Sequence, residues 1–130
     1  KEFYHMINWF EKNKIASVII LILIAVEIFF FSSLPGVPGA GGNPWIARAY
    51  HFIVFFLFCF FLLITIKGRK KIKPSYIFAV LLISIIYSFL DEFHQLFVPG
   101  RDANIVDILT DTLGIFSSAA IYSFISRKKK

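Results

Sequence analysis

Four long apolar stretches limit what this chain can fold into. They cover residues 15–34, 46–66, 75–90 with an extension toward residue 97, and 103–125. Stretches of this kind can cross about 30 Å of hydrocarbon at a rise of about 1.5 Å per helical residue. In lipid, segments this short satisfy all their backbone polar groups only as helices. We therefore predict an all-α integral membrane protein, built as a bundle of four transmembrane helices.

The composition agrees with a membrane location. Hydrophobic residues make up 58% of the 130-residue chain, and the mean hydropathy is +0.74. Soluble domains contain about 45–50% apolar residues. The formal net charge of +6 does not point to nucleic acid, because basic residues that flank apolar spans set orientation and meet anionic headgroups. We expect membrane lipids as partners and no nucleic acid.

The residues before the first span predict a further helix. Its apolar positions at helical spacing are Phe3, Met6, Ile7 and Phe10. This pattern is typical of an amphipathic helix that lies in the membrane interface, and a partner-binding helix is the less favoured alternative. We divide the chain into an N-terminal interfacial amphipathic helix, residues 1–14, and a four-helix membrane domain, residues 15–130.

The distribution of Lys and Arg predicts the orientation. All of these residues except Arg48 and Arg101 lie before the first span, between the second and third, or after the fourth. Loops rich in Lys and Arg stay in the cytoplasm. We expect both termini to be cytoplasmic and residues 91–102 to lie on the extracytoplasmic side.

Acidic residues gather toward the extracytoplasmic half of the predicted bundle. They are Glu27, Asp91, Glu92, Asp102, Asp107 and Asp111. The side chains there that are or can become cationic are Arg48, His51, His94 and Arg101. A carboxylate within a span is costly unless it is paired or hydrated. The surplus negative charge therefore calls for a divalent cation, a bound cationic group, protonation or hydration.

Each polar residue also has an ordinary structural explanation. Asp91, Glu92 and Asp102 can be loop charges in water, and His94 can be an interfacial histidine. A hydrogen bond from Ser32 or a tyrosine would explain Glu27. The remaining explanations are pairing of Arg101 with Asp107 and helix-end packing of Arg48 and His51. Asp107 and Asp111 are the hardest to explain in this way, because two acids one helical turn apart repel each other.

Three segments resemble the VanZ-like family of small bacterial membrane proteins. The first is DEFHQLFVPGRDANIVDILTDTLG, residues 91–114, and the others are FFFSSLPG, residues 29–36, and RAYHF, residues 48–52. Arg48 stands where the family often has lysine, and Phe55 where a tyrosine is common. The resemblance implies a bacterial cytoplasmic membrane and a cell-envelope role associated with antibiotic resistance, namely to the glycopeptide teicoplanin, which bears a lipid.

Three functions remain open on this evidence. The first is an outer-leaflet site that binds or modifies the headgroup of a lipid or a lipid-linked cell-wall precursor. The second is a non-enzymatic binder that shields precursors or excludes a lipidated antibiotic. The third is a small transporter coupled to protons or ions. The sequence leaves open whether the protein is an enzyme, whether a divalent cation is its cofactor, and whether two copies form a homodimer.

The predicted roles follow from side-chain chemistry. Arginine suits phosphate, whereas acids suit hydroxyl groups, amines or metals. For catalysis we predict Asp91 and Glu92 as general base or metal ligands and His94 as acid or base. For substrate binding we predict Glu27, Arg48, His51, Gln95 and Arg101. For a metal we predict Asp107 and Asp111.

Overall fold

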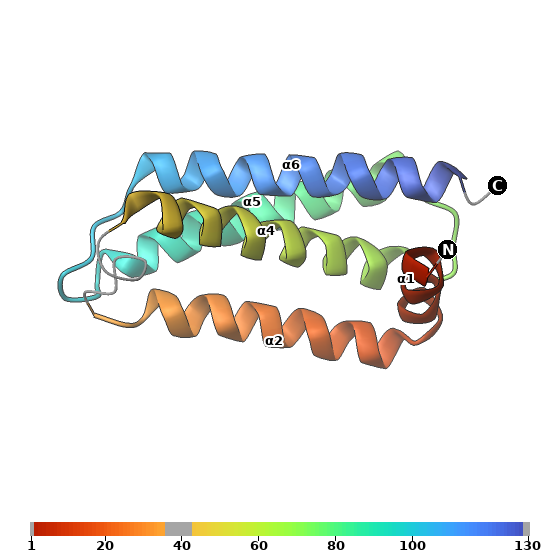
Figure 1. Ribbon diagram of the computed structural model, residues 1–130, viewed down its shortest axis with the longest axis horizontal. Coiled ribbons are helices and arrows are strands. Elements are labelled where there is room, and N and C mark those ends of the chain that lie inside the picture. Colours follow the sequence, from red (N-terminus) through yellow and green to blue (C-terminus); the bar gives the residue numbers. More distant parts are fainter. Residues whose placement is uncertain (1, 36–42, 129–130) are drawn as a thin grey trace.

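The computed structural model describes residues 2–35 and 43–128, and every regular element in these ranges is a helix. The helices are α1 (Glu2–Lys12), α2 (Lys14–Ser32), α4 (Pro44–Lys67), α5 (Pro74–Gln95) and α6 (Ile105–Lys128) (Figure 1). Four of them, α2, α4, α5 and α6, are long and apolar enough to cross a membrane. The prediction of an all-α, multi-pass membrane protein is confirmed.

Local sequence explains where the longest spans begin and end. Pro44 occupies the first turn of α4, where its missing N–H costs nothing, and the Asn43 side chain accepts a hydrogen bond from the Trp45 backbone N–H at 3.0 Å. Pro74 starts α5 in the same way. Gly68, with φ of 52°, ends α4 in the left-handed region that favours glycine.

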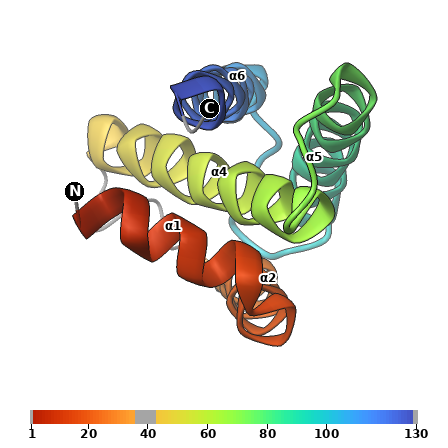
Figure 2. The same ribbon diagram turned by 90° about the vertical axis from the view of Figure 1, so that its right-hand side faces the viewer.

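Helix α4 is the centre of the bundle and contacts each of the other helices. Viewed from the end in Figure 2, it runs between α6 on one side and α1 and α2 on the other. Gly114 permits the close approach of α6, because a Cβ at this position would lie 2.5 Å from the Phe52 carbonyl oxygen. Small residues at such crossings let helix backbones pack closely in membranes.

Apolar side chains fill the middle of the bundle and also cover its outside. Phe55, Cys59, Leu63 and Ile115 are fully buried around α4. The exposed face of α2 carries large apolar residues, among them Ile22. Such an extended apolar surface is abnormal in water and is expected in contact with lipid.

The amino-terminal helix predicted from the sequence is present as α1. Ile7 and Glu11 are buried against the bundle, whereas Phe3, Met6 and Trp9 are exposed. The break between α1 and α2 falls at Asn13, close to the predicted domain limit at residue 14. Division into two domains stays a prediction.

The bundle has two ends, which we distinguish by name. The start of α1, the α4–α5 loop and the end of α6 lie together, and we call this the terminal end (Figure 1). The end of α2 and the α5–α6 loop lie at the opposite end. We call it the cavity end, because a cavity of about 690 Å³ opens there.

Candidate functional site

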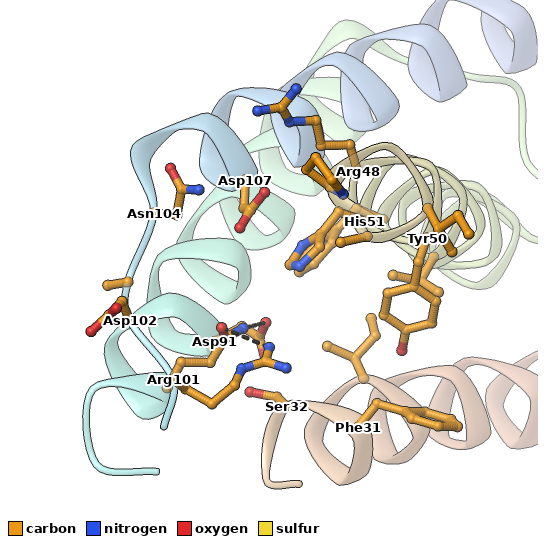
Figure 3. Close-up of a pocket in the computed structure, with 18 of the residues that line it drawn as sticks. Phe31, Ser32, Arg48, Tyr50, His51, Asp91, Arg101, Asp102, Asn104 and Asp107 are labelled. Carbon is orange, nitrogen blue, oxygen red and sulfur yellow. Dashed lines mark hydrogen bonds between the residues drawn. The ribbon is translucent and has the colours of Figure 1, made fainter. Parts of the chain in front are cut away.

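A cavity of about 690 Å³ opens at the cavity end of the bundle, among α2, α4, α5 and the loop that leads into α6. Its polar lining comprises Glu27, Ser32, Asn43, Arg48, Tyr50, His51, Asp91, Gln95, Arg101, Asp102, Asn104 and Asp107 (Figure 3). These residues come from three separate stretches of the sequence, residues 27–32, 43–51 and 91–107. The cavity is therefore a product of the tertiary fold, and most of the predicted site residues meet in it.

The last two turns of α5 supply one wall. Gln95 lies four residues after Asp91 and three after Glu92, which puts it on the same side of the helix as both acids, and all three are buried. Gln95 Nε2 donates hydrogen bonds to Asp91 Oδ2 at 3.1 Å and to Glu92 Oε1 at 3.4 Å. Arg101 Nη2 donates to Gln95 Oε1 at 2.8 Å. Gln95 thus links the two acids to an arginine.

The loop after α5 folds back over the cavity. Gly100 has φ of 77°, a conformation that favours glycine, and Arg101 directly after it reaches Gln95. The Asn104 backbone N–H donates to Glu92 Oε2 at 2.8 Å. The Asn104 side chain accepts a hydrogen bond from the Val106 N–H at 2.9 Å, at the start of α6. The turn therefore brings Arg101 to Gln95 and the Asn104 N–H to Glu92, at the same wall of the cavity.

His51 is held from behind by an acid. Its Nδ1 lies 2.9 Å from Asp111 Oδ1, and Ser88 Oγ donates a hydrogen bond of 2.6 Å to Asp111 Oδ2. Asp111 is 0% exposed and does not line the cavity, whereas His51 does. Asp111 therefore orients the His51 ring from outside the cavity.

Glu27 and Arg48 lie on other parts of the wall. The Tyr50 hydroxyl donates to Glu27 Oε1 at 3.0 Å, which is the tyrosine contact that would explain an acid at this depth. The Arg48 guanidinium lies 5.0 Å from the centre of the Trp45 ring, within the range of a cation–π contact. Arg48 thus lines the cavity while resting on an exposed aromatic ring.

His94 lies away from this cavity. Its Nε2 is 3.0 Å from Ser33 Oγ, and its ring stacks on Phe29 at 4.7 Å between centroids. These contacts join α5 to the end of α2. The role of His94 as a catalytic acid or base stays a prediction, and its position does not add to it.

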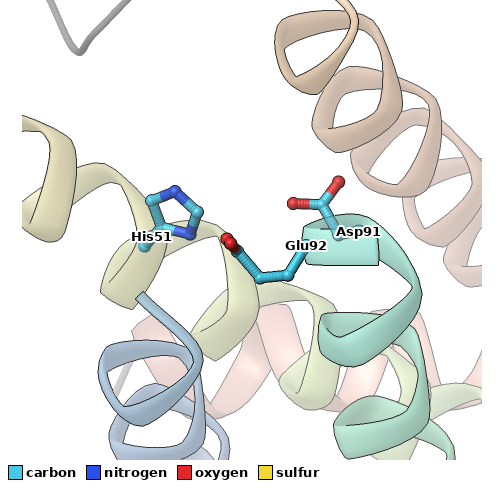
Figure 4. A group of neighbouring side chains, drawn as sticks. All are labelled: His51, Asp91 and Glu92. Atoms are coloured by element: carbon cyan, nitrogen blue, oxygen red, sulfur yellow. The ribbon is translucent and has the colours of Figure 1, made fainter. Parts of the chain in front are cut away.

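Asp107 and Asp111 point to different places despite being one turn apart. Asp107 lines the cavity, and Asp111 lies behind His51. Their joint role as metal ligands stays a prediction. Within the described residues, the group with metal-ligand spacing is instead His51, Asp91 and Glu92, in which one ligand atom from each lies within 4.8 Å of the others (Figure 4).

Several residues of the site were not predicted from the sequence. Ser88 lies three and four residues before Asp91 and Glu92, so the periodicity of α5 contains a signal for it. Tyr50 lies within RAYHF, between two predicted residues. Asn104 acts partly through its backbone N–H, for which side-chain chemistry gives no signal.

Comparison with known proteins gives one family. A family model described as VanZ/LLP1 matches residues 17–126, which is well over half of the chain. The matched range includes every residue of the cavity wall. Neither the curated proteins nor the solved structures contain a match.

Proposed function

The chain belongs to the VanZ/LLP1 family, and from this premise we propose that its cavity binds the phosphate-bearing headgroup of a membrane lipid or of a lipid-linked cell-wall precursor. The location we propose is the outer leaflet of a bacterial cytoplasmic membrane. The observation that carries the proposal is the convergence of Arg48 and Arg101 with several carboxylates on one cavity of about 690 Å³.

The two arginines supply affinity for phosphate. A guanidinium donates two parallel hydrogen bonds to phosphate oxygens and keeps its charge at any physiological pH. Arg101 comes from the α5–α6 loop and Arg48 from α4, and both line the cavity. A phosphate in the cavity could bind at either guanidinium. Glu27 and Asp107 offer acceptors for hydroxyl or amine groups of the same headgroup.

The apolar part of the lining suits the rest of a lipid. Phe31 and Ile46 line the cavity and are also 43% and 48% exposed on the outside of the bundle. A lipid could therefore place its headgroup in the cavity while its acyl chains remain beside α2 and α4. This arrangement leaves the acyl chains in hydrocarbon, so binding does not require their burial in protein.

The orientation follows from the charges at the two ends. Lys67, Arg69, Lys70 and Arg127 belong to the terminal end. Because the cytoplasmic side of a membrane protein carries the excess of Lys and Arg, we assign the terminal end to the cytoplasm. The cavity then opens toward the outer leaflet.

The association of the family resemblance with teicoplanin fits the same site. Teicoplanin acts outside the membrane and carries a lipid chain, so a protein that holds a precursor headgroup at the outer leaflet could shield the target or exclude the antibiotic. Chemistry on the headgroup by Asp91 and Glu92 is the enzymatic form of the proposal. A transporter is less favoured, because the core around Phe55, Leu63 and Ile115 is apolar between the two ends.

Lipid selection in nanodiscs tests the binding. The full chain would be exchanged into nanodiscs of phosphatidylcholine with a small fraction of phosphatidylglycerol or of a polyprenyl-pyrophosphate-linked precursor, and retained lipid would be counted by native mass spectrometry. We expect phosphatidylglycerol or the pyrophosphate-linked lipid to be enriched over phosphatidylcholine. This enrichment should fall about tenfold in Arg101→Gln. Arg127→Gln, an exposed arginine at the terminal end, is the matched control. Equal retention in both variants contradicts the proposal.

A turnover assay separates binding from catalysis. Membrane lipids from cells with and without the protein would be compared by mass spectrometry. A new lipid species that is lost in Glu92→Gln supports the enzymatic form. Unaltered lipids together with retained headgroup binding support the binder.

A further inference from the structure

We propose that His51, Asp91 and Glu92 bind one divalent transition-metal cation, of the Zn²⁺ or Mn²⁺ class. The proposal goes beyond headgroup binding, because such a site is formed by side chains of this chain alone. Asp91 and Glu92 are already predicted from the sequence as general base or metal ligands, and the proposal joins them to His51 in place of Asp107 and Asp111.

The three side chains are already close together. One ligand atom from each residue lies within 4.8 Å of the other two, and the residues are 6%, 7% and 2% exposed (Figure 4). Ligands of tetrahedral zinc are about 3.3–3.6 Å apart when each metal–ligand bond is about 2.0–2.2 Å. Closing the group around a cation therefore requires shifts of about 1 Å in side chains that need no change of backbone.

The contacts behind the ligands are those that a metal site requires. Asp111 Oδ1 engages His51 Nδ1 at 2.9 Å, and Ser88 Oγ fixes the other oxygen of Asp111. This fixes the ring and leaves Nε2 for a metal, as in the carboxylate–histidine–metal arrangement of many sites. Gln95 holds Asp91 Oδ2, and the Asn104 N–H holds Glu92 Oε2. Each of the three ligands thus has a partner that orients it.

The charge of the buried group also favours a cation. Three buried carboxyl groups, those of Asp91, Glu92 and Asp111, surround His51. A divalent ion would offset two of the three negative charges where hydration is weak. Arg101 contributes positive charge at the edge of this group, through Gln95.

Ser32 at the end of α2 belongs to the same wall. Its side chain is buried, lines the cavity and lies near Asp91 (Figure 3). The Ser32 hydroxyl is therefore a further group that can orient the Asp91 carboxylate for a metal.

The ligand set determines the class of metal. One imidazole nitrogen and two carboxylate oxygens suit Zn²⁺, Mn²⁺ or Fe²⁺ better than Mg²⁺ or Ca²⁺, which prefer oxygen ligands throughout. Three protein ligands leave at least one position for water. That this position receives a phosphate oxygen of the headgroup rests on the proposed function, whereas the metal site itself does not.

Direct metal analysis tests the site. The full chain in detergent micelles would be stripped of metal with a chelator, re-equilibrated with ZnCl₂ or MnCl₂ and freed of unbound ion. Its metal content would then be measured by inductively coupled plasma mass spectrometry. We expect one Zn²⁺ or Mn²⁺ per chain. His51→Ala and Glu92→Gln should each reduce the affinity at least about 100-fold, and Asp111→Asn about 10-fold to 100-fold, because second-layer partners have effects of that size. His5→Ala and Glu2→Gln, exposed residues of the same types on α1, are the controls.

Two further readouts keep the proposal testable if a variant does not fold. The wild-type protein should unfold at a higher temperature with ZnCl₂ than with MgCl₂, because a ligand that binds only the folded state stabilises it. Co²⁺ should give visible absorption bands of a low-symmetry site. A wild-type protein with no bound metal and no Zn²⁺-dependent rise in unfolding temperature would overturn the proposal. If lipid is still selected while no metal binds, the metal site alone fails, and the reverse result refutes only the headgroup proposal.

Discussion

His51 and Asp111 form a hydrogen-bonded pair, with Nδ1 and Oδ1 2.9 Å apart, although 60 residues separate them in the sequence. The pair joins α4 to α6 beside the cavity, and Ser88 on α5 donates a hydrogen bond to the other oxygen of Asp111. One carboxylate therefore connects three membrane helices. The orientation of a cavity-lining ring and the packing of the bundle depend on the same contact.

Replacing Asp111 should lower the free energy of unfolding. In Asp111→Ala, His51 Nδ1 and Ser88 Oγ both lose their partner in a buried place, and an unsatisfied buried group costs about 1–3 kcal/mol. We expect a lower free energy of unfolding, measured in detergent micelles by denaturant titration. Asp107→Ala is the comparison, because that acid lies one turn away and is only half-buried. Equal losses in the two variants would show that Asp111 has no special structural role.

The positions of these two acids show how far sequence reasoning reaches. The four spans are predictable because the length and polarity of a segment decide whether it can cross a membrane. The spacing of Asp107 and Asp111 puts them near one face of a helix, but it does not say how α6 is rotated against α4. That rotation places Asp107 in the cavity and Asp111 behind His51.

The neighbours His94 and Gln95 illustrate the same limit. Consecutive residues of a helix point about 100° apart, so the rotation of α5 decides which of the two faces the cavity. Tertiary packing puts Gln95 there and turns His94 toward Phe29 and Ser33. Side-chain chemistry favours His94 as the reactive group. The packing of α2 against α5 places it away from the cavity. Gln95, which is less reactive, lies in the cavity wall.

Adding one methyl group at Gly114 should weaken the bundle. A Cβ there would lie 2.5 Å from the Phe52 carbonyl oxygen and 3.2 Å from the Phe56 nitrogen, both backbone atoms that cannot rotate away. Although alanine favours helix by about 1 kcal/mol over glycine, overpacking costs about 1–3 kcal/mol. We expect Gly114→Ala to lower the unfolding temperature in micelles, whereas Leu113→Ala, at an exposed position next to it, should have a smaller effect. A stabilised Gly114→Ala would refute the close helix contact.

The attachment of α1 should depend on one ion pair. Lys67 Nζ lies 3.0 Å from Glu11 Oε2, both side chains are buried, and the Tyr122 hydroxyl donates to Glu11 Oε1 at 2.7 Å. In Lys67→Met the buried Glu11 carboxylate keeps its hydrogen bond from Tyr122 but loses the lysine. Breaking such a buried pair costs about 3 kcal/mol. We expect faster hydrogen exchange of the α1 amides in the variant. Lys70→Met, an exposed lysine nearby, should leave exchange unchanged. Unchanged α1 protection in both variants would mean that apolar packing of Ile7 suffices.

Gln95 should be needed as a donor as well as an acceptor. Its Nε2 serves Asp91 and Glu92, while its Oε1 accepts from Arg101. Gln95→Glu keeps the acceptor and removes the donor, and it adds a third carboxylate beside two buried ones. We expect a loss of about 1–3 kcal/mol in the free energy of unfolding and, if the proposed metal site exists, partial recovery with ZnCl₂. Gln95→Met, which removes both functions without adding charge, should show no such recovery. Recovery in both variants would place the metal effect elsewhere.

The turn at Gly100 should affect headgroup binding indirectly, through the position of Arg101. Its φ of 77° is strained for any residue with a Cβ, so Gly100→Ala should cost about 1–2 kcal/mol or move the turn. A moved turn would withdraw Arg101 from Gln95, since Arg101 directly follows the glycine. Gly68→Ala is the matched control, because Gly68 also has positive φ, at 52°, but lies at the terminal end. We expect similar losses of stability in the two variants and a weaker selection of phosphatidylglycerol in nanodiscs only for Gly100→Ala. If both variants select lipid as the wild type does, the position of Arg101 does not determine binding, and the role of the loop in the proposed function must be abandoned.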